Sequence, residues 1–225
     1  TFISKVGTDG NAQFIIEDFA KAQINTNYIL ISEDEETGQA FITVNEEGQN
    51  TILVYGGANM TLSATDVDKN KEAFSDADYV VAQLEIPIEA IEQAFKIARE
   101  HKVTTVLNPA PAVELPKSLL SLTDIIIPNE TEAELLSGIS IHSEKNMHQT
   151  VAYFLNLGIS TVLITLGEQG TYYATKNEAK MIPACSVKAV DTTAAGDTFI
   201  GALVSELKPD LSNIKEAIIF ANQAS

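Results

Sequence analysis

From residue 79 onward, short unbroken apolar runs alternate with segments whose apolar residues repeat at helical spacing. The apolar runs predict strands and the periodic segments predict helices. The predicted strands cover residues 79–84, 103–107, 124–127, 161–166 and 186–190. The predicted helices lie around Ile88 to Ala98 and over residues 131–137, 151–157, 195–207 and 214–225. Strands without polar alternation are typical of sheets covered on both faces, so the pattern predicts an α/β fold with a mostly parallel sheet between helices.

The first 78 residues have a different pattern of apolar and polar positions. A helix is predicted over residues 12–23, and short strand-like runs follow at 28–32, 40–44 and 51–55, separated by polar turn sequences. The acidic residues 33–36 in the first turn indicate a solvated loop. The three runs together predict a small antiparallel β-sheet, residues 28–55, inserted in a single α/β domain over residues 1–225.

The two ends of the chain look like interruptions. The sequence opens on Thr1 in an apolar run and stops inside the last predicted helix, without a helix stop signal. We therefore expect this chain to be the middle part of a longer polypeptide.

Charge narrows the range of partners. The 225 residues include 14 Lys and Arg against 31 Asp and Glu, a formal net charge of −17. Such a surface repels nucleic acid and anionic membranes, and no uncharged apolar stretch reaches the roughly 18 residues that a membrane span requires. We expect no nucleic acid and no membrane among the partners. A phosphate-bearing ligand would have to be held by backbone N–H groups, helix N-termini or bound cations.

Cys185 is the only cysteine, and the chain has three histidines. This inventory provides no internal disulfide and no His/Cys metal cluster, and it fits a reducing, cytoplasmic location.

Polar or glycine-bearing residues follow five of the predicted strands. They are Glu85, then Asn108 to Pro111, Asn129 to Glu132, Gly167 to Gly170, and Asp191 to Asp197. Ligands of open α/β sheets bind beyond the carboxyl ends of the strands, so these exits predict one continuous rim around a site.

The last of these exits is the most informative. Ala194, Ala195 and Gly196 have almost no side chain and precede a helix, so their N–H groups could hold an anion at its N-terminus. Asp197 stands in the first turn of that helix, where small residues plus one carboxylate would make an anion hole beside a base. An ordinary helix start explains the same residues equally well, with Thr193 as N-cap and Asp197 as the complement of the helix dipole.

The segment Asp191-Thr192-Thr193-Ala194-Ala195-Gly196-Asp197-Thr198-Phe199 resembles the C-terminal signature of the PfkB-type carbohydrate kinases, and its Ala-Ala-Gly form is similar to that of the ribokinases. Asn129 and Glu132 match the family's Asn-x-x-Glu motif. Segments 55–59, 83–85, 107–111 and 166–170 also stand in the family's order. The resemblance covers essentially the whole chain. It implies a ribokinase-like fold with a small antiparallel β lid, and transfer of the γ-phosphate of ATP to the 5-hydroxyl of D-ribose.

The resemblance also implies roles for individual residues. Asp197 would contact the sugar and be the general base that takes the proton from its hydroxyl, while the backbone of 194–197 would hold the γ-phosphate. Asn129 and Glu132 would act through the nucleotide phosphates and Mg²⁺, with Glu132 working through water. Asp191 and Thr193 would lie near a monovalent cation, usually K⁺.

Other residues would bind the two substrates. By the same resemblance, Thr165, Gly167 and Gly170 would lie along the nucleotide and Asn222 near the adenine. Glu85 would hydrogen-bond sugar hydroxyls. Ala40 and Ile42, in the small sheet, would cover the sugar as part of the lid, and this lid would pair two subunits into a homodimer.

Simpler interpretations remain beside these roles. Asn129 and Glu132 form an N-cap and capping box by pattern alone, the glycines fit an ordinary turn, and Glu85 and Asn222 fit plain surface positions. The family's N-terminal sugar-gripping segment, Gly-Gly-Lys-Gly-Ala-Asn, its first strand with a sugar-binding Asp, and the C-terminal stretch are absent from this sequence.

Alternative functions are a family kinase acting on fructose, a nucleoside or a keto-deoxy sugar acid, and a non-catalytic sugar or nucleotide sensor. Asp197 argues against the sensor, which needs no base. A dinucleotide-dependent oxidoreductase and a P-loop kinase are disfavoured because neither glycine motif is present.

Overall fold

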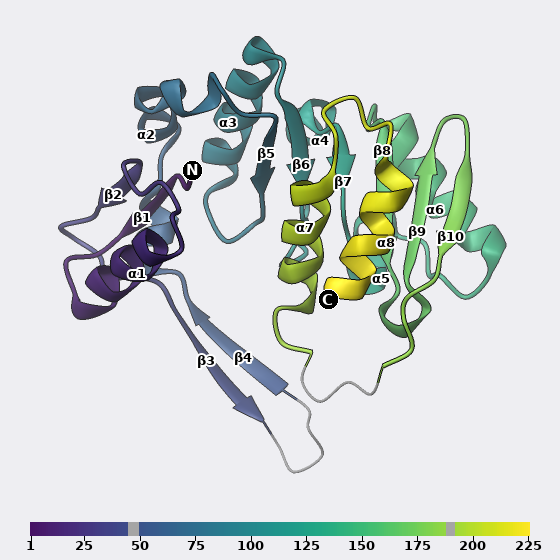
Figure 1. Cartoon of the computed structure of the whole chain (residues 1–225), viewed down its shortest axis with the longest axis horizontal. Coiled ribbons are helices and arrows are strands. Elements are labelled where there is room, and N and C mark those ends of the chain that lie inside the picture. Colours follow the sequence, from purple (N-terminus) through teal and green to yellow (C-terminus); the bar gives the residue numbers. More distant parts are fainter. Residues whose placement is uncertain (45–49, 188–191) are drawn as a thin grey trace. The chain divides into compact units, whose positions relative to one another are not determined.

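The computed structural model describes residues 1–44, 50–187 and 192–225 (Figure 1). Contacts divide the chain into two compact units. The smaller unit consists of residues 1–77 and 85–97, and the larger unit of residues 78–84 and 98–225.

The larger unit is built on a six-stranded mixed sheet with the order β10-β9-β8-β7-β6-β5. Its strands are β5 (Tyr79–Ala82), β6 (Thr104–Leu107), β7 (Ile125–Ile126), β8 (Thr161–Thr165), β9 (Thr171–Thr175) and β10 (Ala179–Ile182). Strands β5 to β8 pair in parallel, which confirms the predicted parallel core of the sheet. Strands β9 and β10 form an antiparallel hairpin on β8 that was not predicted.

Helices cover both faces of this sheet, as predicted. The larger unit contains α4 (Lys117–Leu122), α5 (Glu130–Ser137), α6 (Glu144–Asn156), α7 (Ala195–Glu206) and α8 (Ile214–Ala224). Helices α7 and α8 lie on one face, and α5 and α6 lie on the other (Figure 1). Ile125 and Ile127 pack in one buried cluster with Phe199 and Ile218 of α7 and α8, whereas Ile126 between them is buried on the opposite face.

The strand predicted at 186–190 is not observed in its described part, because Ser186 and Val187 form no strand. Residues 188–190 lie outside the described residues.

The smaller unit contains two separate pairs of strands. Strands β1 (Ser4–Val6) and β2 (Ile29–Ile31) pair in parallel across α1 (Gly10–Lys21). Strands β3 (Gln39–Val44) and β4 (Asn50–Tyr55) form an antiparallel ribbon, here called the β3–β4 ribbon. The rest of this unit consists of the short helices η1 (Gly57–Thr61), α2 (Ala64–Lys69) and η2 (Lys71–Phe74) and most of α3 (Ile88–His101).

The prediction that residues 28–32 belong to the antiparallel sheet is wrong. Residues 29–31 pair with β1, and only β3 and β4 form the antiparallel pair. The physical reason is the helix between the two strands, because a strand that returns after a crossover helix lies parallel to the strand before it.

Among the described residues, no helix combines the length and apolar character needed to cross a membrane.

Candidate functional site

Helix α7 begins in an unusual way. Its N-cap is Ala194, which adopts the left-handed conformation (φ 58°, ψ 16°) and provides no side-chain cap, so the predicted alternative with Thr193 as N-cap is not observed. A left-handed alanine costs on the order of 1–2 kcal/mol relative to the right-handed helical conformation. Such strain is typically kept at functional sites. The strained backbone of Ala194 therefore lies among the residues predicted to bind an anion.

The hydrogen bonds at the start of α7 bear on the predicted anion site. The Ala195 N–H donates to the Thr192 carbonyl oxygen (3.2 Å), so a ligand would compete with that bond at this amide. The N–H groups of a helix's first turn otherwise lack intrahelical partners and suit an anion. Asp197 is exposed in the same turn. Figure 1 shows that α7 begins at the end of the larger unit toward which the arrows of β5 and β6 point. This is the carboxyl end of the parallel strands, where ligands of open α/β sheets bind. Asp191 lies outside the described residues.

Asn129 and Glu132 form the capping box of α5. Glu132 N–H donates to Asn129 Oδ1 (2.8 Å), and in return Asn129 N–H and Nδ2 donate to the two Glu132 carboxylate oxygens (2.9 Å each). Burial raises the pKa of the Glu132 carboxyl group, although the hydrogen bond from the Asn129 backbone opposes this. The capping interpretation is thus confirmed, and it leaves a buried carboxylate whose charged form would gain from a nearby cation.

Thr165 lies next to Asn129 at the start of α5. Asn129 and Thr165 form an isolated parallel bridge, and Thr165 N–H donates to the Pro128 carbonyl oxygen (3.0 Å). The exits of β7 and β8 therefore meet beside the N-terminus of α5.

The turn after β8 depends on two glycines. Gly167 has φ 53° in a short helix, η3 (Gly167–Gln169), and Gly170 closes the turn with φ 102° and ψ −140°. A Cβ atom on Gly170 would overlap the Ile182 carbonyl oxygen and stand 2.5 Å from the Ala184 nitrogen, whereas a Cβ atom on Gly167 would meet nothing within 4 Å. Both positions suit glycine, but only Gly170 is needed for a close backbone approach, which is to the exit of β10.

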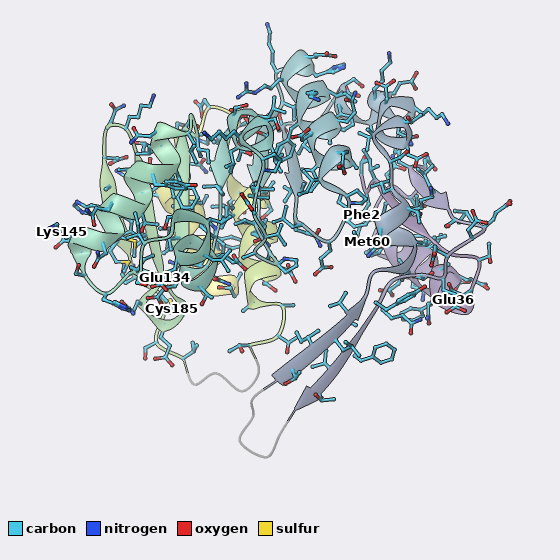
Figure 2. The ribbon with its side chains drawn as sticks, turned by 180° about the vertical axis from the view of Figure 1, so that it is seen from behind. Phe2, Glu36, Met60, Glu134, Lys145 and Cys185 are labelled. Carbon is cyan, nitrogen blue, oxygen red and sulfur yellow. The ribbon has the colours of Figure 1, made fainter. Side chains whose placement is uncertain are left out.

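Asn222 is not a plain surface residue. Its Oδ1 atom accepts a hydrogen bond from the Thr171 hydroxyl (2.8 Å), and its Nδ2 atom donates to the carbonyl oxygens of Ile182 (3.2 Å) and Pro183 (3.4 Å). The side chain thereby ties α8 to β9 and to the end of β10. The sequence did not identify Thr171 or Pro183 as part of this arrangement, because no local pattern links them to Asn222. Cys185, just beyond Pro183, is exposed (Figure 2).

The remaining predicted site residues belong to the smaller unit. Ala40 and Ile42 are exposed on β3, and Glu85 is exposed where the chain enters that unit. The larger unit thus gathers Asn129, Glu132 and Thr165 at the N-terminus of α5. Thr165 pairs with Thr171, whose hydroxyl donates to Asn222, so Gly170 and Asn222 lie next to this group. That Asp197 and the residues of the smaller unit act on the same substrate stays a prediction.

The family model described as pfkB family carbohydrate kinase matches residues 1–225. A ribokinase of Staphylococcus aureus (strain COL) is 63% identical over 225 residues, which is 100% of this chain and 74% of that protein.

Two solved structures are also similar. An Arabidopsis thaliana ribokinase complexed with ribose and ATP superposes with a TM-score of 0.90 at 30% identity, covering 98% of this chain and 72% of that chain. A ribokinase II from E. coli in complex with ATP and Mg²⁺ gives a TM-score of 0.79 at 28% identity, covering 98% and 73% of the two chains.

Proposed function

The chain belongs to the pfkB family of carbohydrate kinases, and from this premise we propose that it transfers the γ-phosphoryl group of ATP to the 5-hydroxyl of D-ribose, giving ADP and ribose 5-phosphate. The observation that carries the proposal is the start of α7, where the left-handed backbone of Ala194 and the exposed carboxylate of Asp197 lie in the same turn. The choice of ribose rests on the 63% identical ribokinase and on the similar structure that holds ribose and ATP.

Asp197 is the general base of the proposed reaction. Its exposed carboxylate accepts the proton of the ribose 5-hydroxyl as that oxygen bonds to the γ-phosphorus in line, and the bond from the γ-phosphorus to the β,γ-bridging oxygen breaks. The proton then passes to solvent, and ADP leaves with the electron pair. Phosphoryl transfer requires positioning and charge stabilisation more than covalent catalysis, so one carboxylate is a sufficient base.

The amides at the start of α7 stabilise the transferred group. Negative charge on the phosphoryl oxygens meets the N–H groups of Ala194, Ala195 and Gly196 and the positive end of the helix dipole. A chain with net charge −17 depends on such local donors to hold a triphosphate.

Glu132 and Asn129 fit a role beside Mg²⁺ and the nucleotide phosphates. Glu132 is a single buried carboxylate whose pKa is raised by burial, and a hydrated dication nearby would offset that desolvation. Mg²⁺ would neutralise charge on the phosphate oxygens. We also infer K⁺ near Thr193 and Asp191, where it would reinforce the anion hole.

Different elements would bind the nucleotide and the sugar. We infer that Thr165, Gly167 and Gly170 lie along the nucleotide, and that Asn222 of α8 lies near the adenine. Glu85 would hydrogen-bond sugar hydroxyls. Ala40 and Ile42 of the β3–β4 ribbon would close over the sugar and exclude water, which otherwise competes as acceptor. A supply of ATP and the single cysteine both fit a cytoplasmic enzyme.

A panel of sugars tests the proposed function. The full-length protein is given ATP, Mg²⁺ and K⁺, and ADP release is measured with ribose, fructose, a nucleoside and a keto-deoxy sugar acid. We expect ribose to give the highest kcat/KM, with activity lost on chelation of Mg²⁺ and reduced when Na⁺ replaces K⁺. A preference for another member of the panel would contradict ribose as the substrate, and nucleotide binding without ADP release would favour the sensor.

The β3–β4 ribbon also supports the proposed homodimer. Its apolar side chains are exposed to an extent that isolated ribbons in water seldom tolerate, namely Phe41 (55%), Ile42 (47%), Ile52 (49%), Leu53 (70%) and Val54 (53%). Phe41 and Leu53 pair on the face of the ribbon opposite to that of Ala40 and Ile42, and we propose that a second copy of the chain covers this Phe41 and Leu53 face. Sedimentation of the full-length protein should give a dimer that dissociates when Leu53 is changed to Glu. A wild-type monomer at micromolar concentration would contradict this proposal.

A further inference from the structure

Both ends of the β3–β4 ribbon are fixed to one cluster of hydrogen bonds in the smaller unit. Thr37 lies two residues before β3, and its backbone N–H donates to Asp9 Oδ2 (2.6 Å) while its hydroxyl oxygen accepts from the Gly7 N–H (3.0 Å). Gly57 and Ala58 follow β4, and the Ala58 N–H donates to the Glu36 carbonyl oxygen (2.8 Å). The residues before and after the ribbon are therefore tied to each other and to the β1–α1 connection.

This cluster is tightly packed. Thr37 is 2% exposed and Ala58 is fully buried. A Cβ atom on Gly7 would stand 2.6 Å from Asp9 Oδ2 and 2.7 Å from the Thr37 nitrogen, and one on Gly57 would overlap the Glu36 carbonyl oxygen. Figure 2 labels Glu36 and Met60 in the segments on either side of the ribbon. Backbone packed this closely has little room for a second arrangement.

Asp9 holds the cluster with both carboxylate oxygens. Oδ1 caps α1 by accepting from the N–H groups of Asn11 (2.9 Å) and Ala12 (3.1 Å), and Oδ2 accepts from Thr37. The hydrogen bond from the Thr37 backbone is the largest of several that lower the pKa of the Asp9 carboxyl group. The ionised side chain thus joins the N-terminus of α1 to Thr37, just before the ribbon.

We propose that Asp9 is a positioning residue for sugar binding: acting through Thr37, it fixes the direction in which the β3–β4 ribbon leaves the smaller unit, and so places Ala40 and Ile42. This inference rests on the proposed function, in which those two residues close over the sugar. This role accounts for the second carboxylate oxygen of Asp9, which a helix N-cap does not need and which accepts from a backbone amide 28 residues away.

Asp9→Asn in the full-length protein tests the proposal. Asparagine keeps an oxygen that can cap α1, but its NH₂ group then faces the Thr37 N–H. Both groups are donors, so the hydrogen bond to Thr37 is lost. We expect the ribose KM to rise about tenfold, the scale of one lost hydrogen bond to a charged group, with kcat and the KM for ATP changed less than threefold. Amides of residues 39–43 and 51–55 should exchange with deuterium at least tenfold faster. Thr37→Ser, which keeps the hydroxyl, should behave like the wild type.

Ser63→Ala is the matched control. It removes the N-cap of α2 in the same unit, where Ser63 Oγ accepts from the Asp66 N–H (3.1 Å), and should lower Tm without changing the ribose KM. If Asp9→Asn changes the ribose KM no more than Ser63→Ala does, Asp9 is only structural. If the wild type phosphorylates no sugar, the proposed function fails, and hydrogen exchange then decides alone: unchanged exchange in the ribbon of Asp9→Asn overturns the proposal.

Discussion

Replacing Asp197 with Asn should lower kcat by at least ~10², because it removes the only base proposed for the ribose hydroxyl while leaving a side chain of the same shape. The affinity for ATP should stay nearly unchanged, since the nucleotide is bound by other elements. Single-turnover phosphorylation of ribose and equilibrium binding of ATP measure the two quantities separately.

Glu206→Gln provides the matched control for that change. Glu206 is an exposed carboxylate at the other end of α7, so the variant carries the same change of charge on the same helix. We expect its kcat to equal that of the wild type. If Asp197 served only as the complement of the helix dipole, Asp197→Asn would slightly lower Tm and leave kcat intact. That result would contradict the base assignment.

Gly170→Ala should have the largest effect on stability among the glycines of the site. Its φ of 102° with ψ −140° is a conformation almost restricted to glycine, which costs other residues roughly 1–3 kcal/mol. The added Cβ would also overlap the Ile182 carbonyl oxygen, and such overpacking costs roughly 1–3 kcal/mol more. We expect a loss of about 2–6 kcal/mol, together with weaker ATP binding, because the exit of β10 must shift. Thermal and urea unfolding measure the loss.

Gly167→Ala separates strain from overlap. Gly167 also has positive φ (53°), but a Cβ atom there would meet nothing within 4 Å. Its loss should be only the roughly 1–2 kcal/mol of a left-handed alanine. Equal losses for the two variants would show that the close approach of Gly170 to the β10 exit has no energetic importance.

The parallel strands of the larger unit could be predicted because each is a continuous apolar run, and burial on both faces produces that pattern. The pairing of residues 29–31 could not be judged from their own composition. It depends on β1 and on the crossover helix α1, which lie outside the run of residues 28–32. The β9–β10 hairpin was missed although its residues Tyr172 and Tyr173 favour a strand and a polar turn follows.

The site was predictable where its residues are close in the sequence. Asn129 and Glu132 are three residues apart, so both the capping box and the family's motif could be recognised. The hydrogen bonds of Asn222 reach residues 40 and 51 positions away, and the bond between Asp9 and Thr37 spans 28 residues. Contacts of this range depend on how the elements pack, which no local pattern encodes.

A crystal structure of the full-length protein with ribose and a non-hydrolysable ATP analogue tests the central claim most directly. We expect the γ-phosphate to lie against the amides at the start of α7, with a carboxylate oxygen of Asp197 within hydrogen-bond distance of the ribose 5-hydroxyl. A γ-phosphate bound at the opposite ends of the parallel strands, or a ribose whose 5-hydroxyl points away from Asp197, would contradict it.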